Sequence, residues 1–206
     1  MEQDRLQHVR NKSNEATEYL KHGDYRGALN SFTAAMELLP EDKYAAKAQL
    51  SSNIGHVLVQ LQQYEAAALS FGKAHEFFFR IDDRLASAEQ LGNIGSVYRD
   101  MENWEDSLAN YFKALAIFEE LGYKIGTADQ CSNIGYICSR QGAVEDALQY
   151  FGKAIDIFIE LGETIKIGLC KQNIQALETL TKKRKQKKSC CRKIVDFDFL
   201  DCDDTN

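Results

Sequence analysis

Asparagine recurs at an almost fixed interval in this chain, and its side chain suits the binding of another polypeptide. A carboxamide carries both a hydrogen-bond donor and an acceptor, so it can pair with the main chain of an extended peptide whatever the peptide's side chains are. The interval is constant between the later copies and shorter by a single position between the first two. The five copies are Asn14, Asn53, Asn93, Asn133 and Asn173. Such a row suits either contact with the main chain of a bound peptide or hydrogen bonds between neighbouring helices that support their curve.

Catalytic and metal-binding residues do not gather in the sequence. His56 is the one histidine close to the asparagine row, and it has no partner at the spacing of a metal site or a catalytic triad. Cys131, Cys138 and Cys170 form no CxxC pair, so we interpret them as small buried hydrophobic residues. There is no glycine-rich phosphate loop and no nucleophile beside a base. The sequence predicts a protein that is not an enzyme and holds no cofactor or metal.

A longer repeated pattern must position the asparagines. The tripeptide Asn-Ile-Gly occupies residues 53–55, 93–95 and 133–135, and residues 173–175 lack only the glycine. Each glycine is followed at fixed offsets by a small residue, then an aromatic and then an alanine, as in Ser107, Tyr111 and Ala114. Small residues let helices approach closely, and the aromatic ring fills the space beside the contact. A period of this length indicates a repeat architecture.

This pattern resembles the tetratricopeptide repeat. Residues Leu91 to Tyr98 resemble the signature of the family's first helix, with Leu91 in place of its tryptophan. The period, about 40, exceeds the usual ~34, and it is similar to the long-helix subgroup that includes kinesin light chains and receptor-coupled G-protein signalling modulators. The resemblance covers roughly residues 5–180. It implies an all-α fold, a right-handed superhelix of four helix-turn-helix repeats with a C-terminal capping helix.

The expected solenoid spans residues 4–181, and residues 182–206 form a basic stretch followed by an acidic, aromatic tail. The repeats are expected at about 4–40, 42–81, 83–121 and 123–161, with the capping helix at 163–181. Glu41 and Asp42 should lie in the opening turn of a helix, where its dipole favours acidic residues. Gly122 and Gly162 suit the left-handed residue that ends a helix, and Asp82 occupies the equivalent place at a higher steric cost.

In the tetratricopeptide family the first helices line the concave face, so the resemblance implies that the asparagine row faces a groove. Residues one or two turns away would then set specificity, and the groove would be mixed in sign. Ser13 and Thr17 stand where chaperone-binding members carry paired lysine and asparagine, which argues against binding of a chaperone tail. The expected peptide-binding residues are Asn14, Asn53, His56, Glu89, Asn93, Ser96, Arg99, Asp129, Asn133, Tyr136, Arg140 and Asn173.

Charge is distributed unevenly along the chain, whose net charge is −6. Residues 1–181 carry 17 basic and 26 acidic side chains, and this acidic body argues against nucleic-acid binding. There is no apolar run of ~18 residues for a membrane span and no secretory signal. Six cysteines without a spacing framework predict reduced thiols and a cytoplasmic protein.

The C-terminal segment leaves several interpretations open. Residues 182–193 contain eight basic and no acidic side chains, which suits a solvated helix end, a nuclear-import or nucleic-acid patch, or, with Cys190 and Cys191, an acylated membrane anchor. Nothing in the sequence reveals acylation. The alternation of Val195, Phe197 and Phe199 with aspartates favours an extended segment. That tail is expected either to be disordered or to dock into the groove of its own or a neighbouring molecule.

The sequence therefore predicts a non-enzymatic adaptor that binds an extended or helical segment of another protein in its concave groove. One alternative is a structural homo-oligomeriser that uses an exposed end of the superhelix. The other is a regulatory subunit tethered through its basic, cysteine-containing C-terminal segment.

Overall fold

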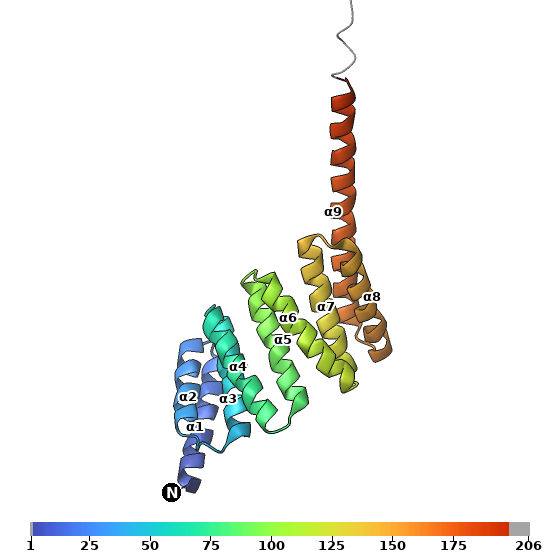
Figure 1. The fold of residues 1–206 in the computed structure, drawn as a ribbon. Helices are drawn as coiled ribbons and strands as arrows, with labels where there is room; N and C mark the ends of the chain where they lie inside the picture. The colour runs from blue at the N-terminus through green and yellow to red at the C-terminus, as the bar shows by residue number, and fades with distance from the viewer. Residues whose placement is uncertain (1, 198–206) are drawn as a thin grey trace, which may run out of the picture.

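The computed structural model describes the backbone of residues 2–197 and the side chains of residues 2–183. All the secondary structure within that part of the chain is helical (Figure 1). The helices are α1 (Glu2–Lys21), α2 (Tyr25–Glu37), α3 (Tyr44–Gln60), α4 (Tyr64–Arg80), α5 (Arg84–Asp100), α6 (Trp104–Glu120), α7 (Lys124–Gln141), α8 (Val144–Leu161) and α9 (Thr164–Phe197).

The helices form four antiparallel pairs that stack one after another, and α9 covers the last pair. Each helix packs mainly against the helices before and after it in the chain. The first helices of successive repeats also meet, because α5 contacts α7 and α7 contacts α9. Figure 1 shows the pairs following each other from the blue end to the orange end. This right-handed superhelix of four repeats and a cap confirms the predicted fold.

In the second, third and fourth pairs a glycine of the first helix meets an aromatic ring of the second. A Cβ atom added to Gly95 would lie 2.6 Å from Cδ1 of Tyr111, whose side chain is fully buried. Ser107 is also buried, and its hydroxyl donates to the carbonyl of Gly95 over 2.7 Å. The repeated small and aromatic residues are therefore the contact surface within each pair.

Local signals end the helices where the sequence indicated. Gly122 and Gly162 adopt left-handed φ angles of 66° and 73°, as expected. Asp82 adopts the same conformation with φ 58°, and so do Gln62 and Glu102. A residue with a Cβ atom pays about 1–2 kcal/mol for this geometry, so three turns between consecutive helices are mildly strained: those after α3, α4 and α5.

The start of α3 differs from the prediction. Glu41 and Asp42 lie in the turn that follows Pro40, and α3 begins at Tyr44. The amide of Lys43 donates to the carbonyl of Pro40 over 3.3 Å. This hydrogen bond closes a turn that contains Glu41 and Asp42. Glu41 instead pairs with Lys47 over 3.0 Å.

The prediction of an extended segment from residue 194 onward is wrong for residues 194–197, because α9 continues as a helix to Phe197. Each residue added to an existing helix gains one hydrogen bond without a new nucleation cost. Residues 169–197 contain neither proline nor glycine to stop the helix. Residues 198–206, with Phe199 and the rest of the acidic tail, lie outside the described residues.

Candidate peptide-binding groove

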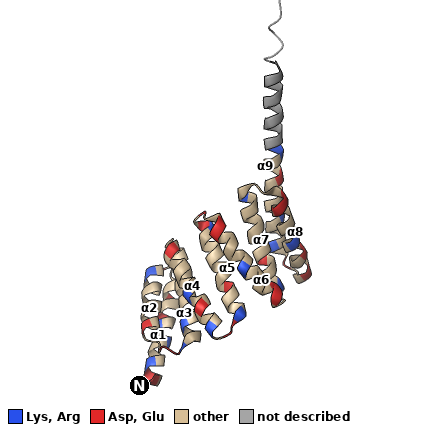
Figure 2. Ribbon diagram, viewed as in Figure 1, with Lys and Arg blue, Asp and Glu red and all other residues tan. Residues whose placement is uncertain are grey.

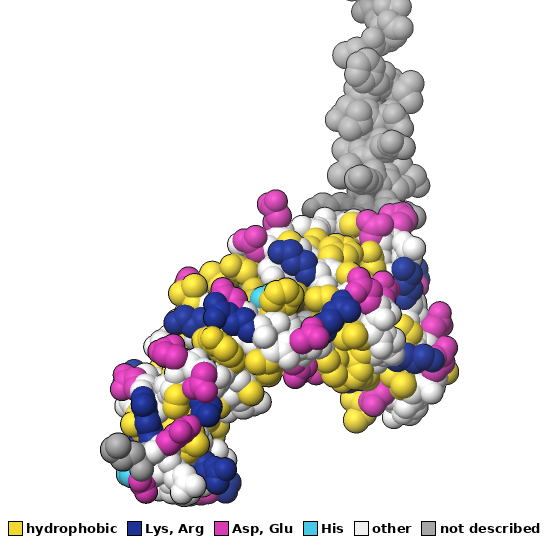
Figure 3. Space-filling model, turned by 60° about the horizontal axis from the view of Figure 1, so that its bottom comes forward, with side chains coloured by type: hydrophobic (Ala, Val, Ile, Leu, Met, Phe, Trp, Pro, Cys, Tyr) yellow, Lys and Arg dark blue, Asp and Glu magenta, His cyan; other side chains and the backbone are white. Residues whose placement is uncertain are grey.

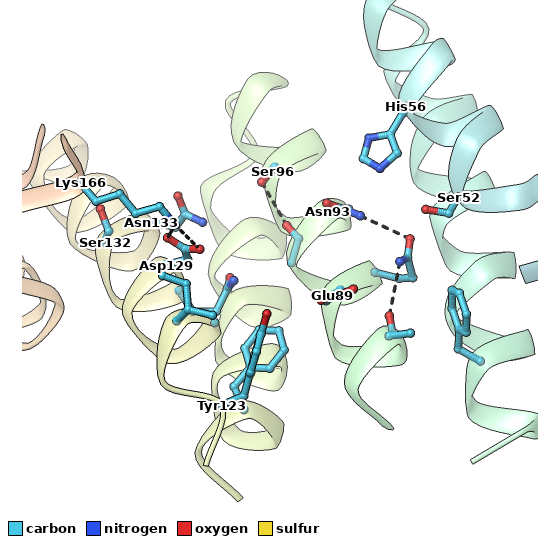
Figure 4. Close-up of a pocket in the computed structure, with 18 of the residues that line it drawn as sticks. Ser52, His56, Glu89, Asn93, Ser96, Tyr123, Asp129, Ser132, Asn133 and Lys166 are labelled. Carbon is cyan, nitrogen blue, oxygen red and sulfur yellow. Dashed lines mark hydrogen bonds and ion pairs between the residues drawn. The ribbon is translucent and has the colours of Figure 1, made fainter. Parts of the chain in front are cut away.

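The concave side of the superhelix contains an open cavity of about 810 Å³. Its polar wall comes mainly from α3, α5 and α7, and the start of α9 closes one end (Figure 4). A cavity of this size lies in the range of ligand sites in proteins. A second cavity, of about 400 Å³, adjoins it between α1, α2 and α3 and shares His56 with it. We call the two together the groove.

The three central asparagines of the row face this groove. Asn93 and Asn133 line the larger cavity, and Asn53 lines the smaller one. All three are half-buried. The Nε2 atom of Gln49 donates to Oδ1 of Asn53 over 3.1 Å, and Nδ2 of Asn93 donates to Oε1 of Gln90 over 3.3 Å. Each of these amides keeps further hydrogen-bonding groups for a ligand.

Of the three asparagines that line the groove, Asn133 alone makes no hydrogen bond within the described residues. Its carboxamide projects into the groove beside Asp129 (Figure 4). The ends of the row behave differently. Asn14 is exposed on α1 and Asn173 is half-buried on α9, and neither lines the groove. Three of the five predicted asparagines therefore line the groove.

Four other predicted residues also line the larger cavity, namely His56, Glu89, Ser96 and Asp129. The ring of His56 packs edge-on against Phe71 at 4.9 Å, and partial burial lowers its pKa, which favours the neutral imidazole at pH 7. Ser96 donates to the carbonyl of Gly92 and lies 3.1 Å from the hydroxyl of Tyr111. His56 and Ser96 therefore add uncharged polar atoms to a groove that also holds the carboxylates of Asp83, Glu89 and Asp129.

The remaining three predicted residues are engaged elsewhere. Arg99 forms two hydrogen bonds to its neighbour Asp100, over 2.9 and 2.8 Å. The guanidinium of Arg140 lies 5.9 Å from the ring centre of Trp104 and 4.0 Å from Glu102. Tyr136 packs against the core around α7 and α8. None of the three lines the groove.

Sequence reasoning missed several polar residues of the groove, and for two of them, Gln130 and Lys166, the repeat carries a signal. Gln130 lines the larger cavity and stands one full repeat after Gln90, which also lines it. Lys166 stands one full repeat after Gly126 and replaces the small residue found at this point in the earlier repeats. Its ammonium group contacts both carboxylate oxygens of Asp129, at 2.7 and 2.9 Å. This ion pair links the cap to α7 at one end of the groove.

Charges of both signs are interspersed along the superhelix. Figure 2 shows Lys and Arg beside Asp and Glu on successive helices, and Figure 3 shows apolar side chains between them on one face. Within the described residues no cluster of histidine, cysteine and acidic side chains could hold a metal ion. None of the described helices is long and apolar enough to span a bilayer.

The three described cysteines, Cys131, Cys138 and Cys170, are free and buried, which confirms their interpretation as small core residues. Burial raises the pKa of each thiol, and that of Cys131 to about 11. Since the thiolate is the reactive form, the reactive fraction of Cys131 at pH 8 should be about 100-fold below that of an ordinary thiol.

We therefore expect Cys131 to resist iodoacetamide at pH 8 in the native protein. It should react fully in about 8 M urea, which unfolds most small domains. Because the pKa is raised, increasing the pH from 7 to about 9 should add little thiolate at this site. Mass spectrometry of the cysteine-containing peptides measures the labelling. Equal labelling rates with and without urea would contradict the buried position.

Comparison with known proteins bears on the whole solenoid. Residues 85–160 match the model of a family described as the tetratricopeptide repeat. No curated protein matches the sequence. Among solved structures, aspartyl phosphate phosphatase F from Bacillus subtilis is similar at 19% identity, with a TM-score of 0.72 over 87% of this chain and 51% of that one.

Two further structures share the fold. BtubC from P. vanneervenii has a TM-score of 0.66 at 17% identity, over 96% of this chain and 84% of that one. A signal-transduction ATPase with numerous domains and a tetratricopeptide repeat sensor, from Pyrococcus horikoshii, has a TM-score of 0.77 at 18% identity, over 93% of this chain and 31% of that one. The chain thus spans about half of the phosphatase and about a third of the ATPase. At these identities the likeness is one of fold: most of the chain shares the helical solenoid of these structures, and residues 85–160 match the tetratricopeptide repeat.

Proposed function

We propose that the protein is a non-enzymatic adaptor whose groove binds an extended or helical segment of another protein. The observation that carries this proposal is the placement of Asn93 and Asn133 on the first helices of successive repeats, both lining one open cavity. A carboxamide can donate to a main-chain carbonyl and accept from a main-chain N–H. Two of them at one repeat spacing would hold a segment of backbone in a fixed direction.

The groove is built from helices that pack on the core, so its shape exists before the ligand arrives. Gln90 and Ser96 flank Asn93 on α5, and both form hydrogen bonds within the protein. Most of the entropy lost on binding therefore falls on the ligand segment rather than on the protein. A cytoplasmic location belongs to the same proposal and is supported by the free thiols of the described cysteines.

The double variant Asn93→Ala/Asn133→Ala tests the proposal. Each change removes hydrogen bonds to the ligand worth about 1 kcal/mol, so retention of bound peptides should fall by roughly 10- to 100-fold. The measurement is the dissociation constant for decapeptides selected by the wild-type protein from a random library, with circular dichroism to follow helicity.

The matched control is Asn11→Ala/Asn110→Ala, which changes two asparagines outside the groove. This control should bind the selected peptides with wild-type affinity. Equal affinities for the groove variant and the control, at equal helicity, would remove the asparagine row from the binding mechanism.

A further inference from the structure

We propose that the groove between α5 and α7 accepts a lysine or arginine side chain of the bound segment, with Glu89 as its counter-ion and Oε1 of Gln130 as a hydrogen-bond acceptor. This inference rests on the proposed function, because it names the chemistry recognised by the same groove. It concerns one side chain of the ligand, whereas the asparagine row concerns its main chain.

The first observation is an orphaned acceptor. Gln130 lines the larger cavity with only 7% of its surface exposed, and its Oε1 atom has no hydrogen-bond partner within the described part of the chain. A buried carbonyl oxygen without a donor is costly, so such atoms are uncommon in folded proteins. A ligand that brings an N–H group to this atom would remove that cost.

The second observation is a carboxylate beside it. A Cβ atom added to Gly92 would lie 3.2 Å from Nε2 and 3.5 Å from Oε1 of Gln130, so this amide rests directly against α5. Glu89 lies one helical turn before Gly92, and it shares a face of α5 with Asn93 (Figure 4). Within the described residues Glu89 has no ion-pair partner.

The surroundings of Glu89 would favour a cation beside its carboxylate. Partial burial and the nearby Asp83 raise the pKa of its carboxyl, which means that the surroundings disfavour its negative charge. An ammonium or guanidinium group placed beside it would reverse that effect. The one lysine that lines the cavity, Lys166, is already bonded to both oxygens of Asp129 and lies 5.3 Å from the ring centre of Phe158.

The cavity also offers apolar surface for the methylene groups of a long basic side chain. Phe78 and Tyr123 line the same space as Glu89 and Gln130. Lysine and arginine commonly pack their aliphatic stems on such surfaces while their charged ends reach polar groups. An acidic side chain would instead meet the unpaired carboxylate of Glu89, and an apolar one would leave Oε1 of Gln130 without a donor.

The test uses three pools of labelled decapeptides whose fifth residue is lysine, norleucine or glutamate and whose other positions vary among uncharged residues. The full-length protein should retain the lysine pool about tenfold better than the norleucine pool. In Glu89→Gln, a nearly isosteric change that removes the charge, that preference should fall to about twofold or less. Gln130→Leu should also reduce it, whereas Glu178→Gln, an exposed change on α9 outside the groove, should preserve it.

The outcomes separate this inference from the proposed function. Equal retention of all three pools by the wild-type protein would overturn recognition of a cation and leave the peptide groove in place. Preference for the glutamate pool would overturn it as well, and retention of no pool would overturn both proposals. An undiminished lysine preference in Glu89→Gln would exclude Glu89 as the counter-ion, and this variant decides the matter even if Gln130→Leu proves to be misfolded by circular dichroism.

Discussion

Replacing Gly95 by alanine is expected to lower the free energy of unfolding by about 2 kcal/mol. The new methyl group would lie 2.6 Å from the ring of Tyr111, which is closer than a Cβ atom approaches the non-bonded atoms of other residues. The ring cannot move away freely, because it is fully buried and its hydroxyl lies 3.1 Å from that of Ser96. Either α5 and α6 must separate or the ring must leave its rotamer, and both disturb the third repeat.

The matched control is the same change at Gly72, another glycine in the middle of a helix. A Cβ atom there would meet nothing within 4 Å, so only the helix propensity changes. Alanine should therefore stabilise α4 at this position by roughly 0.5–1 kcal/mol. Urea unfolding followed by circular dichroism measures both variants. If the free energy of unfolding changed in the same direction in both variants, the close contact between Gly95 and Tyr111 would be contradicted.

The same contact explains why the repeat was readable from the sequence. Glycine recurs because α3, α5 and α7 each approach a ring on the partner helix, and the fourth copy of the tripeptide loses the glycine at Gln175. Within the described residues no partner helix follows α9, and Gln175 is exposed. The missing glycine thus marked the end of the solenoid. Some helix ends were also predictable, such as those at Gly122 and Gly162, which adopt the expected left-handed conformation.

The site was only partly predictable, because spacing fixes the face of a helix but not the partners of a long side chain. Asn93 and Asn133 are short, so their position on the first helices placed them in the groove. Arg99 and Arg140 are long, and each finds an anion or a ring inside the protein instead. The partner of Arg99 is its neighbour Asp100, whereas those of Arg140 belong to the preceding repeat, and repeat spacing alone reveals neither choice.

The extent of α9 was unpredictable for a different reason. The sequence beyond Leu180 offers no apolar stripe, so periodicity gave no sign of a helix there. Propagation from the packed part of α9 needs no such stripe, since each added residue gains a hydrogen bond. Residues Thr164 to Phe197 form one helix, and the packing that anchors it lies in its first half.

That anchoring leads to the second large effect, because replacing Leu177 by aspartate is expected to release α9 from the fourth repeat. Leu177 is 5% exposed and belongs to the core cluster that contains Phe151 and Phe158. Losing the leucine and burying a charge without a partner should cost about 4 kcal/mol. Aspartate at Ala176, which is exposed one residue earlier, adds the same charge and should cost only about 0.5 kcal/mol through helix propensity.

Hydrogen exchange followed by mass spectrometry separates a local effect from a global one. A solenoid repeat depends mainly on its immediate neighbours, so Leu177→Asp should expose the amides of α7 and α8 while α1 to α4 keep their protection. Equal protection of α7 and α8 in the Leu177 and Ala176 variants would show that α9 is not the cap that stabilises the fourth repeat. Because Lys166 reaches Asp129 from α9, release of this helix should also open the end of the groove, which ties the stability of the cap to the shape of the binding surface.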